Sequence, residues 1–285
     1  MARGRTVSAA AHGRTTTDGA SAHDGPRTKD SASARQEDSV EQGRQDRGIV
    51  VAIDGPSGSG KSTVSRRLAR ELGLAYLDTG AMYRAATWWC GRSGVDLDDV
   101  PAVAEAVRAM PLTMLTDPEE PRVVCDGVDV TDAIREAGLT AVVSKVATNL
   151  EARAELKRLQ REIIADAAAG TVRNSATQGS GRGIVAEGRD ITTVVAPDAD
   201  VRILLLADER ERLARRAKER HGTADAATIA ATRDEVVRRD ADDSTVSTFL
   251  TAADGVVTVD SSSFGVDETF AAVLAVVTRA QEARR

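Results

Sequence analysis

The chain has 285 residues and a mass of 30.0 kDa, enough for one large domain or two small ones. Its content of 41% hydrophobic and 29% charged residues is typical of a globular protein, and no apolar run is long enough to predict a membrane-spanning helix. The formal net charge of -6 argues against nucleic-acid or anionic-membrane partners, because such binding depends largely on neutralising phosphates.

Residues 1–47 are predicted to form a disordered tail, and residues 48–285 the folded domain. The tail is too poor in hydrophobic residues for burial to offset the entropy of ordering it. Its early arginines are not followed by the apolar run of an export signal, so we expect a cytoplasmic protein. Cys90 and Cys125 fit no disulfide or zinc pattern and are expected to be buried thiols.

The folded part begins with an apolar run, a Gly-rich turn and an amphipathic segment, which together predict strand, loop and helix. Buried strands are predicted at 49–54, 74–78, 183–188, 201–207 and 255–260. Helices are predicted at 80–91, about 141–168, 208–220 and 266–283. Strands that are apolar on both faces and separated by helices indicate an α/β fold with a covered parallel sheet.

Two segments interrupt this alternation. Between residues 96 and 134 a Pro-punctuated, helix-like piece precedes RVVCDGVDVT, which reads as short strands joined by a Gly-containing turn, so an insertion subdomain is predicted. The segment TVRNSATQGSGRG (171–183) is rich in Ser and Gly and is predicted to be a flexible surface loop.

The segment GPSGSGKST (55–63) fits G-x-x-x-x-G-K-[ST] between a predicted strand and a predicted helix. Its glycines let backbone N–H groups turn toward a phosphate, and the helix N-terminus favours an anion. Lys61 is expected to reach the β- and γ-phosphates of ATP, and the Ser62 hydroxyl is expected to bind Mg²⁺. The candidate ATP-binding residues are Gly55, Pro56, Ser57, Gly58, Ser59, Gly60, Lys61, Ser62 and Thr63.

Two later motifs lie at predicted strand ends, where a second ligand would sit. LDTGAMYR (77–84) carries Asp78, Thr79 and Arg84, which suit a second phosphate-bearing ligand or an ordinary capped helix with a surface arginine. VAEGRDITTVV (185–195) carries Arg189 and Asp190, which suit an anion and a base edge or a local surface pair. The guanine-reading NKxD of switch GTPases is absent from the sequence.

Two helical motifs add further charged candidates. Arg215 and Arg216 in LARRAKER either close over donor phosphates or lie on a solvated helix face. Arg239 and Asp243 in VVRRDADDST are spaced i, i+4, a geometry that suits a sugar contact or an ordinary stabilising ion pair. Each motif is ambiguous when it is taken alone.

In this order, GPSGSGKST, LDTGAMYR, GVDVTDAIR, VAEGRDITTVV and RRDADDST resemble the bacterial cytidylate kinase family, a branch of the nucleoside monophosphate kinases, over about residues 48–281. The resemblance implies a three-layer α/β/α P-loop NTPase fold with five parallel strands. It also implies a nucleoside-monophosphate-binding insertion at about 96–170 and a mobile lid at about 208–240. The implied reaction transfers the γ-phosphoryl group of ATP, with Mg²⁺, to CMP or dCMP, in a monomer.

The family's functional residues carry over by motif. The resemblance implies that Lys61, Arg84, Arg189, Arg215 and Arg216 are catalytic, with the last two on the lid. It implies that Thr79 contacts the nucleotide, that Arg84 and Arg189 hold the acceptor phosphate, that Ser144, Arg153 and Asp190 recognise cytosine, and that Arg239 and Asp243 hold the ribose.

The sequence departs from the family after Thr245, where an arginine is expected but the text reads DSTVSTFL. Loss of one charge-assisted phosphate contact is expected to weaken CMP binding or the transition state by ~10- to 100-fold unless Arg238 replaces it. Thr192 also stands where the family commonly has Gly. Two alternatives therefore stay open: a P-loop kinase with a different small acceptor, and a nucleotide-binding protein without catalysis.

Overall fold

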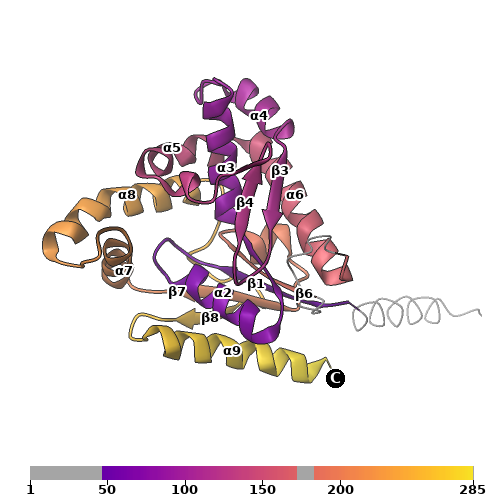
Figure 1. The fold of residues 1–285 in the computed structure, drawn as a ribbon. Coiled ribbons are helices and arrows are strands. Elements are labelled where there is room, and N and C mark those ends of the chain that lie inside the picture. Colours follow the sequence, from indigo (N-terminus) through magenta and orange to yellow (C-terminus); the bar gives the residue numbers. More distant parts are fainter. Residues whose placement is uncertain (1–46, 172–182, 285) are drawn as a thin grey trace, which may run out of the picture. The chain divides into compact units, whose positions relative to one another are not determined.

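The computed structural model describes residues 47–171 and 183–284 (Figure 1). Its main sheet is parallel, with strand order β2-β6-β1-β7-β8. The strands are β1 (Ile49–Asp54), β2 (Ala75–Asp78), β6 (Gly183–Gly188), β7 (Val201–Leu206) and β8 (Val257–Asp260). All five predicted strands are confirmed as strands, but β8 is largely exposed and not buried as predicted. The predicted tail and Ser/Gly-rich loop lie, apart from residues 47, 171 and 183, outside the described residues.

Burial on both faces explains the continuous apolar runs of the central strands. Along β1, Val50 and Ala52 face one core cluster, whereas Val51 and Ile53 face the other. β1 and β6 pair in register from Ile49 opposite Gly183 to Asp54 opposite Gly188. The strand ends therefore lie together at the carboxyl edge of the sheet, where open α/β sheets bind ligands.

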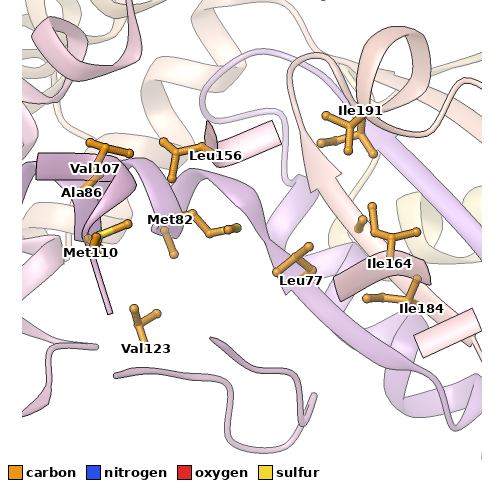
Figure 2. Close-up of a cluster of buried hydrophobic side chains, with 14 of the residues drawn as sticks. Leu77, Met82, Ala86, Val107, Met110, Val123, Leu156, Ile164, Ile184 and Ile191 are labelled. Atoms are coloured by element: carbon orange, nitrogen blue, oxygen red, sulfur yellow. The ribbon is translucent and has the colours of Figure 1, made fainter. Parts of the chain in front are cut away.

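Helices cover both faces, which confirms the predicted three-layer α/β/α architecture. On one face lie α2 (Lys61–Leu72) and α9 (Val266–Ala283), which pack against β1 and β7 (Figure 1). On the other face lie α3 (Thr79–Arg92) and α6 (Leu150–Ala169). Figure 2 shows this second core, where Leu77 and Ile184 from the sheet lie near Met82 of α3 and Ile164 of α6.

The segment between α3 and α6 holds α4 (Val100–Arg108), a three-stranded antiparallel sheet, a 3₁₀ turn η1 (Ala133–Arg135) and α5 (Ala137–Ala147). The predicted helix-like piece and short strands are confirmed as α4, β4 (Arg122–Cys125) and β5 (Val128–Asp129). The strand β3 (Leu112–Leu115) was not predicted, because its partly exposed residues show no clear alternation. Met110 and Val123 extend the core of Figure 2 into this segment.

The single helix predicted at about 141–168 is wrong, because α5 and α6 are separate helices. The break falls at Thr148–Asn149, where the Asn149 side chain accepts hydrogen bonds from the N–H groups of Glu151 and Ala152. An asparagine that bonds to these N–H groups starts a new helix instead of continuing the old one. The turn lets α6 leave α5 and pack on the sheet.

A π-helical turn, η2 (Ile191–Val195), follows β6. The helices α7 (Glu209–His221) and α8 (Ala226–Ser244) follow β7 and contact each other (Figure 1). The buried Asp54 carboxylate holds η2 by accepting hydrogen bonds from the N–H groups of Ile191 and Thr192 and from the Thr192 hydroxyl. A glycine at 192 would lack this last bond. Cys90 and Cys125 are buried free thiols, as predicted. No helix among the described residues is long and apolar enough to cross a membrane.

Replacing Leu68 by alanine is expected to lower the free energy of unfolding by about 2–5 kcal/mol, because Leu68 is fully buried between α2 and the sheet. Val257→Ala is the matched control, since this side chain is 44% exposed and its truncation should cost less than about 0.5 kcal/mol. Urea denaturation of both variants provides the measurement. Equal losses of stability would contradict the assignment of Leu68 to the core.

Candidate active site

The loop between β1 and α2 approaches its neighbours too closely for side chains at two of its glycines. Gly55 has a φ of 155°, and a Cβ built there would lie 2.1 Å from the carbonyl oxygen of Leu205. Gly58 has a φ of 78°, and its Cβ would lie 2.5 Å from the carbonyl oxygen of Arg212. The G-x-x-x-x-G-K-[ST] motif therefore forms a tight loop pressed against β7 and α7, followed directly by the N-terminus of α2.

Lys61 begins α2 and folds back over this loop. Its Nζ donates a hydrogen bond to the carbonyl oxygen of Pro56 at 2.9 Å. Burial lowers the pKa of Lys61 to about 8, an effect that Arg189 reinforces and that Glu187 and Asp240 oppose. A half-buried ammonium with one backbone partner is well suited to receive phosphate oxygens.

Glu187, at the end of β6, provides a buried carboxylate beside the loop. It accepts hydrogen bonds from the Tyr76 hydroxyl at 2.5 Å and from the Ser62 hydroxyl, and burial together with the nearby Asp78 raises its pKa. The Thr79 hydroxyl donates to the Glu187 carbonyl at 2.7 Å. Ser62, Glu187 and Asp78 thus gather oxygen ligands at one end of the loop.

A cavity of about 560 Å³ opens in front of the loop, and its charge is opposite to that of the whole chain. Three acidic side chains line it, namely Asp78, Glu187 and Glu219. Eight basic side chains line it, namely Lys61, Arg84, Arg135, Arg189, Arg215, Arg216, Lys218 and Arg239. Such an excess of positive charge in a partly closed site favours a highly anionic ligand.

Several of these guanidinium groups have unused donors. Arg84 Nη1, Arg216 Nε and Arg239 Nε are buried without a hydrogen-bond partner in the described part of the chain. Burial, Arg84 and Arg189 lower the pKa of Arg239 to about 9, and burial likewise lowers that of Arg84. Because buried donors normally find partners, these groups indicate a ligand with several acceptor oxygens.

Arg84 and its motif lie at the start of α3. Asp78 caps this helix by accepting a hydrogen bond from the Ala81 N–H at 3.0 Å, so the capped-helix interpretation is correct for the carboxylate. Arg84, however, is not a surface arginine, because its side chain is only 14% exposed and points into the cavity lining, 3.8 Å from Asp78. Arg135 of η1 approaches the same carboxylate at 3.9 Å.

Arg189 does not form the local surface pair with Asp190 that the motif allowed. Its Nη1 contacts Asp240 at 2.8 Å and its Nε contacts Asp243 at 2.6 Å, both on α8. Its guanidinium also stacks on the fully buried Phe249, 4.4 Å from the ring centroid. The Nε of Arg239 lies 3.8 Å from Asp243, farther than the 2.6 Å of the Arg189 contact. The i, i+4 pair is therefore the weaker of the two.

Asp190 instead pairs with α6. Its Oδ2 lies 2.6 Å from Arg153 Nη2 and 3.1 Å from Lys157 Nζ, and all three groups are largely buried. Arg153 also donates to the carbonyl oxygen of Ala147 and stacks on Tyr83. Ser144 lies on α5, and neither it nor Arg153 nor Asp190 is among the described residues that line the cavity.

The two arginines of α7 differ in their surroundings. Arg215 donates to the carbonyl oxygens of Ser59, Ser261 and Phe264, which joins α7 to the phosphate loop. Arg216 pairs with Glu219 at 2.7 Å and lines the cavity with its unpartnered Nε. Neither lies on a fully solvated helix face.

Most sequence-predicted residues therefore meet at one edge of the sheet, and the structure adds several that sequence reasoning missed. Arg135 lines the cavity, although the motif GVDVTDAIR by itself indicates no role for it. Arg238, the candidate replacement for the missing arginine, is exposed and lies outside the cavity lining. Glu187 and Asp240 were missed as well. The only available sequence signal was closeness to a predicted site arginine, because Asp240 directly follows Arg239 and Glu187 lies two residues before Arg189.

Comparison with known proteins gives a consistent result. The family model described as cytidylate kinase matches residues 51–279. A protein named cytidylate kinase from Cutibacterium acnes is 46% identical over 230 residues, covering 80% of this chain and 96% of that protein. Proteins with the same name from Nocardia farcinica and Streptomyces avermitilis are 47% and 40% identical, covering 79% and 83% of this chain and 91% and 95% of theirs.

Proposed function

Because the chain belongs to the cytidylate kinase family, we propose that the cationic cavity at the carboxyl edge of the sheet is where it joins ATP to its acceptor. The enzyme is a nucleoside monophosphate kinase that phosphorylates CMP and dCMP with ATP. The observation that carries the site assignment is the single cavity shared by the glycine-rich loop, Lys61, Arg84 and Arg189.

On the donor side, the loop from Gly55 to Thr63 wraps the phosphates of ATP with its N–H groups. Lys61 leaves the Pro56 carbonyl and contacts the β- and γ-phosphates. The Ser62 hydroxyl, with Glu187 and Asp78 behind it, fits Mg²⁺, which prefers oxygen ligands and keeps several of its waters. When bound, Mg²⁺ would neutralise negative charge on the phosphates of ATP.

On the acceptor side, Arg84 and Arg189 grip the phosphate of the monophosphate, and Thr79 at the start of α3 contacts the nucleotide. Both guanidinium groups line the cavity, and Arg84 has an unused buried donor. Arginine suits this task because its planar fork binds two phosphate oxygens and keeps its charge. Arg239 and Asp243 hold the ribose.

Cytosine is read by Asp190 and Arg153, with Ser144 on the neighbouring helix. The carboxylate accepts from the exocyclic amine of cytosine, and the guanidinium donates toward its carbonyl oxygen or N3. Their mutual contact at 2.6 Å and the second contact of Asp190 to Lys157 orient both groups. Uracil would present an oxygen to the Asp190 carboxylate and is therefore rejected.

In the reaction, a phosphate oxygen of CMP forms a bond to the γ-phosphorus while the bond to the β–γ bridging oxygen breaks, releasing ADP. Such transfer needs alignment and charge neutralisation more than a proton-accepting base. The arginines of the cavity supply the positive charge. Arg215 and Arg216 belong to the proposed lid at about 208–240, which closes over ATP and excludes water.

The pH dependence of ATP binding tests the role of Lys61. The pKa of Lys61 is about 8 in the folded chain and 10.5 in the unfolded chain. Between these two pH values the unfolded chain binds more protons, so the contribution of Lys61 to stability rises with pH there. Phosphate favours the charged form, so ATP affinity should fall as pH rises above about 8, by up to ~10-fold per pH unit. Calorimetry in two buffers should show proton uptake on ATP binding at pH 8.5, and Lys61→Met should show none. Equal affinities at pH 7 and 9 would contradict this role.

The function is tested by ADP release from ATP and Mg²⁺ with CMP, dCMP, UMP, AMP and GMP as acceptors. Turnover with CMP and dCMP that stops on removal of Mg²⁺ is expected. Turnover with another acceptor alone would indicate a changed substrate, and tight ATP binding without any turnover would indicate a binding protein. We further propose that the enzyme is a cytoplasmic monomer; light scattering at about twice 30.0 kDa would reject the monomer.

A further inference from the structure

A single carboxylate, Asp240 on α8, touches both halves of the cavity. Its Oδ1 accepts hydrogen bonds from the Ser57 N–H at 3.2 Å and from Arg189 Nη1 at 2.8 Å. Ser57 belongs to the phosphate loop and Arg189 to the opposite wall. The two walls are thus joined through one oxygen atom of a residue that is only 8% exposed.

Arg212 of α7 completes the connection. Its Nη1 lies 2.5 Å from Asp240 Oδ2 and 2.9 Å from the carbonyl oxygen of Ser57. Asp240 and Arg212 therefore hold both the N–H and the C=O of Ser57. Burial would raise the pKa of Asp240, but the guanidinium groups of Arg189 and Arg212 outweigh it and leave this pKa below its ordinary value. The carboxylate is accordingly charged, and its bonds are of the strong, charge-assisted kind.

Arg189 has a second carboxylate partner, Asp243, at 2.6 Å. Asp243 is the proposed ribose ligand, so the acceptor nucleotide competes with Arg189 for this carboxylate. Once the ribose occupies Asp243, Asp240 is the carboxylate that still fixes the plane of the Arg189 guanidinium. The orientation of Arg189 then depends on its stacking on Phe249 and on the position of Asp240, and through Asp240 on the conformation of the loop at Ser57.

We propose that Asp240 is a positioning residue that couples the phosphate loop to Arg189, so that ATP and CMP each bind more tightly when the other is present. The inference rests on the proposed function of the cavity. ATP orders the loop at Ser57, the ordered loop fixes Asp240, and Asp240 presents Arg189 to the acceptor phosphate. By thermodynamic linkage the effect is reciprocal.

The test measures CMP binding to the full chain by calorimetry, alone and with a saturating ATP analogue whose β–γ bridge is a methylene group. In the wild type, the analogue should tighten CMP binding by about 5- to 150-fold, the usual range of coupling between sites. In Asp240→Asn this ratio should fall to about 1, because a neutral amide can no longer hold the loop and Arg189 together. Asp234→Asn, an exposed carboxylate on the same helix, should keep the wild-type ratio.

A purely structural role for Asp240 would weaken both substrates while the ratio stays at the wild-type value, and this outcome would overturn the proposal. So would a wild-type ratio of 1. If Asp240→Asn does not fold, Arg212→Met tests the same connection, because it removes the Nη1 group that donates to both Ser57 and Asp240. If the wild type binds no CMP, both the coupling and the proposed function are rejected. If CMP binds normally and the variant keeps the wild-type ratio of CMP affinities with and without the analogue, only the coupling is rejected.

Discussion

Lys61→Met is expected to lower kcat for CMP phosphorylation by about 10³-fold, the loss typical of removing one preorganised charge from a water-poor site. Lys61 is half-buried, has the Pro56 carbonyl as its hydrogen-bond acceptor, and lines the cavity beside the arginines. Methionine preserves the apolar stem but cannot neutralise the β- and γ-phosphates. Steady-state ADP release with CMP measures the effect.

The same substitution should not weaken the fold. Burial lowers the pKa of Lys61, so the charged form is disfavoured in the folded chain, and its removal relieves that cost at pH 7. We expect a midpoint of urea unfolding at or above that of the wild type. A kcat within about threefold of the wild type would place the donor phosphates elsewhere, since every 1.4 kcal/mol of lost stabilisation is a tenfold change in rate.

Arg189→Ala is expected to lower kcat/KM for CMP by about 10³-fold, because two charge-assisted contacts to phosphate are worth about 1.5–3 kcal/mol each. The loss should be large in this chain because the arginine that the family pattern leads us to expect after Thr245 is missing. Asp240 keeps Arg212 as a partner and Asp243 keeps Arg239, so the fold should survive. The KM for ATP should change by less than about threefold, a small effect on this scale.

Two further variants sharpen this result. Arg189→Lys keeps the charge but not the fork, so its kcat/KM should lie between those of alanine and wild type. Arg238→Ala tests the other candidate for the missing phosphate contact; because Arg238 is exposed and outside the cavity lining, kcat/KM should not change. A tenfold loss in Arg238→Ala would show that this residue reaches the acceptor phosphate, and an unchanged Arg189→Ala would reject the acceptor assignment.

The parts of the fold that depend on residues adjacent in the sequence could be predicted from the sequence alone. The strands β1, β2, β6 and β7 are short apolar runs that are largely buried on both faces, and their composition alone distinguishes them from the amphipathic helices. The strand β8 is largely exposed. The break between α5 and α6 was missed although its signal is local, because the apolar period continues across Asn149. The strand β3 was missed because its residues are only partly buried and show no alternation.

The sequence by itself determined the phosphate loop, because Gly55, Gly58 and Lys61 lie within a few residues of each other and their conformations are local. It also marked most of the arginines around the cavity. Which carboxylate each arginine contacts was decided by the tertiary structure alone. Arg189 pairs with Asp240, 51 residues away, instead of its neighbour Asp190, and Asp240 reaches Ser57 across 183 residues. Such pairings depend on how α6 and α8 meet the end of the sheet, and no local pattern encodes that distance or direction.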